Sequence, residues 1–227
     1  MPTLEENFAK LQSRIENACN LASISTNNVQ LIAVSKRHTA DKIKALHALG
    51  QRHFAENYLQ EALEKQAVLS DMDINWHFIG HIQSNKTKAL AEHFGWVHSV
   101  DRIQIATRLS AQRPSNLPDL NICLQVNIDN EHSKSGFAPE QIPLAFTEIN
   151  SLPGLSLRGL MAIPSAAADP EQQRDSMLRM QHLFNSLQGP AHFDTLSMGM
   201  SRDLEIAVQA GATMLRVGEA LFGPRPN

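Results

Sequence analysis

Short apolar runs alternate with amphipathic segments along the whole chain. The runs are four to nine residues long, which is typical of strands. Between them, apolar residues recur every three or four positions, which is the period of a helix with one buried face. The pattern predicts eight strands, at or within residues 31–35, 52–56, 75–79, 96–100, 122–128, 155–163, 195–198 and 214–217. A further amphipathic helix precedes them, with Leu4, Phe8, Leu11, Ile15 and Ala18 on one face.

Regular alternation of strands and helices predicts parallel strands, because each helix carries the chain back to the start of the next strand. Eight such repeats in 227 residues match a single (β/α)8 TIM barrel with an extra N-terminal helix. A doubly wound open sheet is the alternative. Since no linker, low-complexity tract or sharp change of composition divides the chain, we expect one domain covering residues 1–227.

Composition narrows the class of protein. With 42% hydrophobic and 19% charged residues, the chain is an ordinary globular one, and its net charge of −3 argues against binding nucleic acid or an anionic membrane. Two cysteines, Cys19 and Cys123, are too few for a disulfide framework and indicate a reducing compartment. Residues 1–10 lack the apolar core of a secretory signal, and no stretch approaches the ~18 apolar residues of a membrane span. We therefore expect a soluble cytoplasmic protein.

Lys36 directly follows the first predicted strand, Leu31 to Ser35. A lysine amine at the rim of a packed core has a lowered pKa, because burial disfavours its charged form. The deprotonated amine is nucleophilic and can form a Schiff base with a carbonyl compound. The alternative interpretation is a solvated lysine that merely ends a strand.

A barrel would gather the polar residues that end its strands, because active sites of such barrels lie at the C-terminal ends of the strands. Phosphate groups in these folds bind in the loops after strands seven and eight, here residues 199–201 and 218–220. Lys36 and two glycine loops together suggest a ligand with an aldehyde at one end and a phosphate at the other. The strand-end residues are Lys36, Asn57, His77, Asn127, Ser197 and Arg216.

Arg216 and His77 each allow two interpretations. Alternation along the last strand aims Arg216 at the barrel mouth, where its guanidinium either pairs with an acid such as Glu56 or donates to a ring nitrogen of a ligand. A permanent cation there would keep a pyridine nitrogen unprotonated and make the ring a weaker electron sink. His77 and His81 are four residues apart, but Gly80 breaks the element between them, so we expect no metal site.

Several short segments, in this order, carry a resemblance to a known family. They are LIAVSK at 31–36, FAENY at 54–58, WHFIG at 76–80, QSNK at 83–86, RGLM at 158–161, SMGMS at 197–201 and RVG at 216–218. Together they resemble the YggS/PROSC family of pyridoxal 5′-phosphate (PLP) homeostasis proteins. The resemblance runs from the first strand to Phe222 and Gly223, and it implies the barrel of alanine racemases.

The resemblance also implies roles for individual residues. Lys36 would carry PLP as a Schiff base, and Arg216 would face the pyridine nitrogen. Ser201 and the amides at Gly218 and Glu219 would hold the phosphate. The remaining residues of the implied cofactor site are Asn57, His77, Met161, Ser197 and Met200.

Glu219 departs from the family pattern, and Lys134 is an additional candidate for the cofactor site. Relatives often have a small hydroxyl residue after the glycine of the last motif, where this chain has Glu219. A carboxylate repels a phosphate, so we expect the side chain to point away and the affinity for phosphate to be weaker. Lys134, in the polar loop 129–136, is a further candidate for transient contact with PLP.

The same resemblance bears on whether the protein is an enzyme. A two-base racemase needs a second proton donor opposite the cofactor, and racemases of this type resemble one another in supplying a tyrosine from an added β-domain. This chain has one tyrosine, Tyr58, and ends soon after the eighth strand. We therefore expect a monomeric, non-catalytic protein that holds PLP and controls its supply to PLP-dependent apo-enzymes. The alternatives are a small PLP-dependent racemase or decarboxylase, and a Schiff-base aldolase that acts without PLP.

Overall fold

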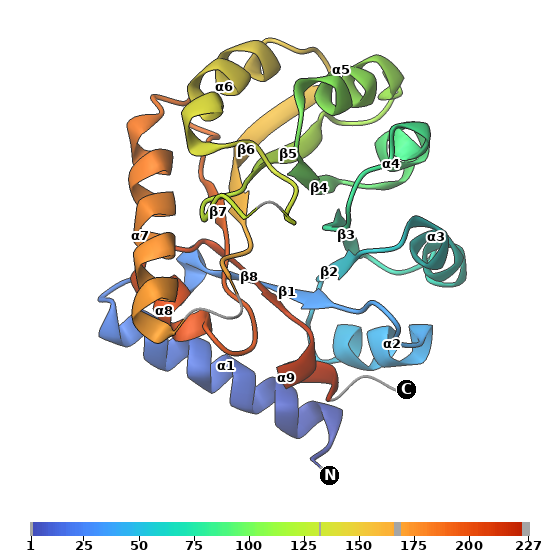
Figure 1. Cartoon of the computed structure of the whole chain (residues 1–227). Helices are drawn as coiled ribbons and strands as arrows, with labels where there is room; N and C mark the ends of the chain where they lie inside the picture. The colour runs from blue at the N-terminus through green and yellow to red at the C-terminus, as the bar shows by residue number, and fades with distance from the viewer. Residues whose placement is uncertain (1, 132, 166–168, 224–227) are drawn as a thin grey trace.

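Eight parallel strands close into a barrel at the centre of the computed structural model, which describes residues 2–131, 133–165 and 169–223 (Figure 1). Each strand pairs with the next, and β8 pairs with β1 to close the barrel. The predicted TIM barrel is thus confirmed, and the open-sheet alternative is wrong. The strands are β1 Gln30–Val34, β2 His53–Glu56, β3 Asn75–Phe78, β4 Trp96–Val100, β5 Leu120–Val126, β6 Leu155–Ala162, β7 Thr195–Ser197 and β8 Met214–Val217.

Helices surround the barrel and connect successive strands (Figure 1). They are α2 Ala40–Ala48, α3 Leu59–Val68, α4 Thr87–His93, α5 Ile103–Gln112, α6 Ile142–Asn150, α7 Pro170–Ser186, α8 Leu204–Gln209 and α9 Glu219–Phe222. Short 3-10 turns lie at η1 Thr26–Asn28, η2 Ser84–Lys86 and η3 Pro139–Gln141. Among the described residues, no helix is both long enough and apolar enough to cross a lipid bilayer.

The predicted N-terminal helix is α1, Leu4–Leu21. Thr3 and Glu6 form a reciprocal capping box that satisfies two amides at its start. Its apolar face packs against α8 and α9, which follow β7 and β8 (Figure 1). Arg14 strengthens this contact by binding Glu205 of α8 at 2.7 Å. Helix α1 therefore supports, from outside, the two loops predicted to bind phosphate.

The core has two layers because side chains alternate between the faces of each strand. On β1, Ile32 and Val34 point into the barrel, while Leu31 and Ala33 pack against the surrounding helices. Continuing that alternation places Lys36 on the inward side of the barrel mouth. The inner layer consists of Ile32, Val34, Ala55, Trp96, Cys123, Met161 and Met214.

Strand β5 begins and ends two residues earlier than predicted. Asn127 leaves the ladder because its side chain accepts a hydrogen bond from the amide of Glu131 at 3.1 Å and donates to the carbonyl of the same residue at 2.9 Å. Asparagine commonly closes such loops by bonding to backbone a few residues away. Asn127 therefore folds the loop after β5, and its apolar neighbour Ile128 packs in the outer core.

Candidate functional site

Lys36 lies two residues beyond the last residue of β1 and is half-buried. The chain turns sharply after it, because Arg37 adopts a left-handed conformation with φ of 62°. Two residues later, the ring of His38 stacks on Phe222 of α9, with 4.5 Å between ring centroids. The turn that carries Lys36 is thus fixed against the helix that follows β8.

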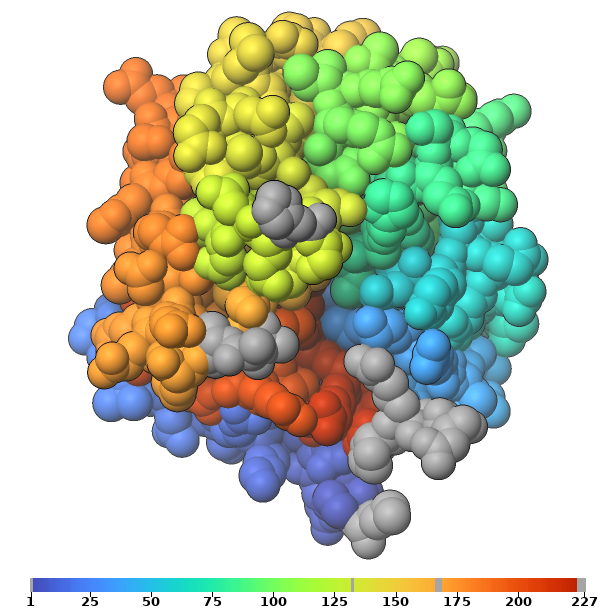
Figure 2. All heavy atoms as spheres, viewed as in Figure 1, coloured from blue at the N-terminus to red at the C-terminus, as the bar shows by residue number. Residues whose placement is uncertain are grey.

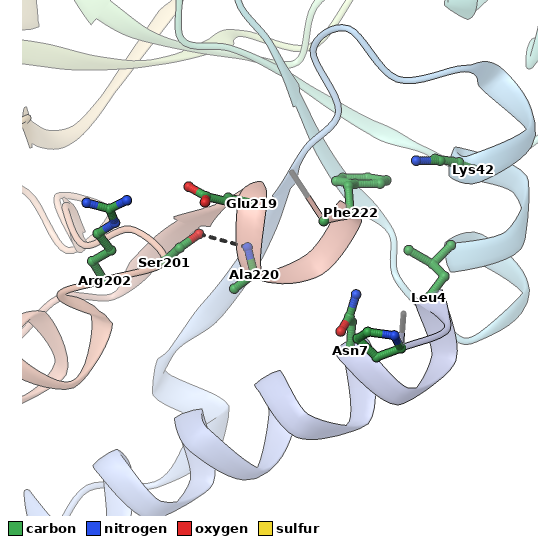
Figure 3. A pocket seen from close by; sticks show the side chains of 10 residues that line it. Leu4, Asn7, Lys42, Ser201, Arg202, Glu219, Ala220 and Phe222 are labelled. Atoms are coloured by element: carbon green, nitrogen blue, oxygen red, sulfur yellow. Dashed lines mark hydrogen bonds between the residues drawn. The ribbon is translucent and has the colours of Figure 1, made fainter. Parts of the chain in front are cut away.

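The two glycine loops predicted to bind phosphate are in direct contact. The hydroxyl of Ser201 accepts a hydrogen bond from the amide of Ala220 at 3.1 Å (Figure 3). Arg14 donates to the carbonyl of Ser201 at 3.1 Å, which ties the loop to α1. Gly218 lies so close to β1 that an added Cβ would be 3.2 Å from the carbonyl oxygen of Val34. The structure therefore brings Lys36 and both loops to one sector of the barrel mouth.

A cavity of about 230 Å³ lies between the ends of β2, β3, β5 and β6. Its wall includes Asn57, whose side-chain oxygen is buried and has no hydrogen-bond partner in the described part of the chain. Gly80 permits this geometry, because a Cβ at that position would overlap the carbonyl oxygen of Asn57. Buried polar atoms are normally paired, so this oxygen is suited to a donor supplied by a ligand. In the space-filling view, the face is hollowed beside the loop after β5 (Figure 2).

A larger cavity of about 850 Å³ lies beside the two loops, lined by Ser201, Glu219 and Ala220 together with Leu4, Asn7 and Lys42 (Figure 3). It shares the predicted phosphate-binding residues, but neither Lys36 nor Arg216 lines it.

Arg216 is buried inside the barrel. Its guanidinium donates to the hydroxyl of Ser197 at 2.8 Å and to the carbonyl of Ala162 at 2.9 Å. The alternative pairing with Glu56 is wrong, because that carboxylate lies on the outer face of the sheet and binds Lys65. Burial lowers the pKa of Arg216 to about 10, so the side chain stays cationic at neutral pH. Within the described part of the chain, two of its five N–H donors have acceptors.

A chain of histidines continues from Ser197 across the barrel interior. The hydroxyl of Ser197 lies 2.9 Å from Nδ1 of His98, whose Nε2 lies 2.9 Å from Nδ1 of His77. His77 Nε2 lies 2.9 Å from Nδ1 of His53, the first residue of β2. The chain therefore runs from the N-terminal end of β2 to the C-terminal end of β7.

The hydrogen bonds of this chain are compatible with two directions of donation. Arg216 can only donate, so Ser197 accepts from it, and the hydroxyl can either donate to Nδ1 of His98 or accept a second hydrogen bond from it. In the first case His98 and His77 carry their protons on Nε2, and in the second case on Nδ1. Burial lowers the pKa of His98 to about 3, with Arg216 adding repulsion, and it lowers the pKa of His77 well below the ordinary value. Both rings are neutral at pH 7.

This chain was not predicted, although its signal is present in the sequence. His53, His77 and His98 occupy inward positions on three consecutive strands. Both ring nitrogens of His77 bind other histidines, Trp96 stacks on the ring with 5.4 Å between ring centroids, and the residue is fully buried. Its predicted role in lining the cofactor pocket stays a prediction.

The other predicted site residues lie around the same mouth. Met161 is fully buried in the inner layer of the core. Met200 is half-buried in the loop after β7, where its amide donates to Asp203 at 2.5 Å. Glu219 is exposed at the start of α9. Lys134 binds Glu131 at 2.6 Å and lines the 230 Å³ cavity. Their contacts with a ligand stay predictions.

Comparison with known sequences gives a consistent family. The model of the alanine racemase N-terminal domain family matches residues 7–226. A pyridoxal phosphate homeostasis protein of Pseudomonas aeruginosa is 54% identical over 225 residues, covering 99% of this chain and 97% of that protein. The protein of the same name from Escherichia coli is 42% identical over 229 residues, covering 99% and 98%.

Solved structures agree with these sequence matches. PipY of Synechococcus elongatus, solved with PLP bound, superposes with a TM-score of 0.80 at 38% identity, covering 92% of this chain and all of that one. An alanine racemase of Clostridium difficile has a TM-score of 0.75 at 14% identity and shares the fold, with this chain covering 60% of it. By fold and sequence, the chain belongs to the pyridoxal phosphate homeostasis family, whose barrel is that of the alanine racemase N-terminal domain.

Proposed function

We propose that this protein binds PLP at the mouth of its barrel, holds it as a Schiff base on Lys36, and acts in PLP homeostasis. The observation that carries the proposal is the position of Lys36, on the inward side of β1 and in the same sector as two contacting glycine loops. The relatives named for PLP homeostasis and the PLP-bound PipY support it.

The residues of the barrel mouth fit this cofactor. PLP supplies an aldehyde that condenses with an amine and a ring that can accept electrons. The amine of Lys36 would take the aldehyde, and Arg216 would donate toward the pyridine nitrogen. Ser201 and the amides at Gly218 and Glu219 would hold the phosphate. The unpartnered oxygen of Asn57 offers an acceptor beside the ring.

We further propose that the protein is a carrier and not an efficient enzyme. A cationic Arg216 near the ring nitrogen disfavours the protonated ring that carbanion chemistry requires. The one tyrosine of the chain, Tyr58, is 49% exposed and lies under the guanidinium of Arg37 at 6.0 Å, just before α3. That position supports a surface role and not a proton donor in a closed site.

Two further observations bear on the compartment and on the oligomeric state of the protein. Cys19 and Cys123 are both buried and free, as is usual in a reducing cytoplasm, where we place the protein. The exposed large apolar side chains are scattered over several elements, which favours a monomer. We propose that residues 1–227 form a single PLP-binding domain. We also propose that PLP-dependent apo-enzymes receive the cofactor from it.

The absorption spectrum of the purified protein mixed with PLP tests the central proposal. The wild type is expected to show the visible band of a PLP–lysine Schiff base, and Lys36→Ala is expected to lose it. Amino-acid racemisation by the wild type should stay far below an enzymatic rate of roughly 1 s⁻¹. A band of equal strength in Lys36→Ala would contradict the role of Lys36, and rapid racemisation would contradict the carrier proposal.

A further inference from the structure

A cluster of charged side chains, two of them buried and one partly buried, lies directly behind Lys36, between the sheet and helix α3. It consists of Glu56 at the end of β2 and of Glu61 and Lys65 on α3. We infer that this trio positions the PLP-binding lysine, by holding the backbone on both sides of Lys36 so that its side chain points into the barrel. The inference rests on the proposed function, which assigns Lys36 as the residue that takes the aldehyde.

Lys65 is the centre of the trio. Its ammonium donates to Glu56 at 2.7 Å, to Glu61 at 2.7 Å and to the carbonyl oxygen of Ser35 at 2.8 Å. An ammonium has three hydrogens, so all three have an acceptor. The carbonyl of Ser35 belongs to the peptide group that leads into Lys36. Lys65 therefore fixes the peptide plane on the N-terminal side of the lysine.

Glu61 holds the peptide group on the other side. Its carboxylate accepts a hydrogen bond from the amide of Arg37 at 2.5 Å, and that amide belongs to the peptide leaving Lys36. Arg37 has a left-handed backbone, which is unfavourable for a residue with a side chain and needs support from its surroundings. With both adjoining peptide planes held, the direction of the bond from Cα to the Lys36 side chain is fixed.

A third contact ties the trio to the strand itself. The hydroxyl of Ser35 donates to Glu56 at 2.6 Å. Because neighbouring residues on a strand face opposite sides, a Ser35 side chain held on the outer face directs Lys36 inward. The trio thus acts on Lys36 entirely through backbone and neighbours, from the face of the sheet opposite to the cofactor.

The burial of the trio argues for this geometric role. The side chains of Glu56 and Lys65 are 0% and 8% exposed. Buried ion pairs contribute little net stability, because removing charges from water offsets their attraction. Lys88 and Glu92 on α4 have the same four-residue spacing as Glu61 and Lys65, but they are exposed on the helix surface. Unlike that exposed pair, the trio forms hydrogen bonds with the backbone of the turn that carries Lys36.

Glu61→Ala tests the inference, because Glu61 is only partly buried and its loss leaves the contact between Lys65 and Glu56 in place. Glu64→Ala, an exposed change on the same helix, is the matched control. Glu61→Gln keeps an acceptor oxygen for the amide of Arg37 and serves as the conservative variant. Ser35→Ala is an independent second variant that removes the hydroxyl contact without changing any charge.

Three quantities are measured on each full-length variant: amide hydrogen exchange at residues 36 and 37 without cofactor, the Kd for PLP, and the thermal midpoint. In Glu61→Ala we expect faster exchange at Arg37 and about tenfold weaker PLP binding, the size of one lost charge-assisted hydrogen bond. Ser35→Ala should weaken binding about threefold. Glu61→Gln should recover most of the affinity, and Glu64→Ala should match the wild type in all three quantities.

The outcomes separate this inference from the proposed function. If the wild type fails to bind PLP on Lys36, the proposed function fails. If the wild type binds PLP and both Glu61→Ala and Ser35→Ala keep its Kd and its exchange rates, the positioning role is overturned. An affinity loss that only follows the thermal midpoint, without faster exchange at Arg37 in folded protein, would also overturn it.

Discussion

The histidine chain inside the barrel predicts a steep loss of stability in mild acid. In the unfolded chain a histidine has a pKa near 6.5 and binds a proton as the pH falls below that value. In the folded protein, burial and the nearby Arg216 hold His98 neutral down to a pKa of about 3. The unfolded state therefore binds more protons between these values, and the free energy of unfolding decreases as the pH is lowered.

The size of this loss follows from the pKa difference. Each pH unit between the two pKa values costs about 1.4 kcal/mol, so lowering the pH from 7 to 5 removes about 2 kcal/mol through His98. His77 adds to the loss in the same direction, because burial and the neighbouring histidines lower its pKa well below the ordinary value. The loss of about 2 kcal/mol through His98 alone is already a substantial part of a typical stability of 5–15 kcal/mol.

Urea unfolding of the cofactor-free protein at pH 7, 6 and 5 measures this loss. His98→Gln is the informative variant, because an amide can both donate to His77 and accept from Ser197 without titrating. It is expected to lose about 2 kcal/mol less than the wild type over this range. His93→Gln, on the surface, is the control and should follow the wild type.

Comparing variants removes the effect of other groups. Burial raises the pKa of Glu56, so its contribution to stability is largest in acid and is lost as the pH rises through its folded pKa. That contribution is common to the wild type and His98→Gln and cancels in the difference. Equal losses in the two proteins would refute the assignment of a neutral, buried His98.

Two further changes test the geometry of the mouth. Gly80→Ala places a methyl group against the carbonyl of Asn57, so the strand ends must separate. We expect a destabilisation of about 1–3 kcal/mol, measured by urea unfolding, and weaker PLP binding, measured by titration. Unchanged values would refute the close approach. Glu219→Thr removes a carboxylate beside the proposed phosphate site. Because two like unit charges about 4 Å apart in water repel by about 1 kcal/mol, the Kd for PLP should fall about fivefold. An unchanged or higher Kd would place the phosphate elsewhere.

The barrel was predictable because its signals are local. A buried strand and an amphipathic helix each leave their period in a few consecutive residues, so all eight strands could be placed to within two residues at each end. The position of Lys36 at the mouth and the pairing of the two glycine loops follow from fold rules once the barrel is assumed. The departure at Asn127 comes from side-chain bonding to the loop, which periodicity does not record.

The networks around the site were not predictable, because they depend on contacts between elements. His53 and His77 meet because β2 and β3 pair with Ala55 opposite His77, a register that neither strand specifies alone. Lys65 reaches the carbonyl of Ser35 only because α3 packs against β2, the strand next to β1. In the sequence, the spacing of Glu61 and Lys65 is that of an ordinary surface pair on a helix.

Reduction of the PLP-loaded protein with borohydride, followed by peptide mapping, tests the central claim most directly. Borohydride converts a Schiff base into a stable bond, so the labelled lysine identifies the residue that holds the cofactor. We predict one dominant pyridoxyl group on the peptide containing Lys36, and its absence from Lys36→Ala. A label mainly on another lysine, such as Lys134, or no label on the wild type, would contradict the account.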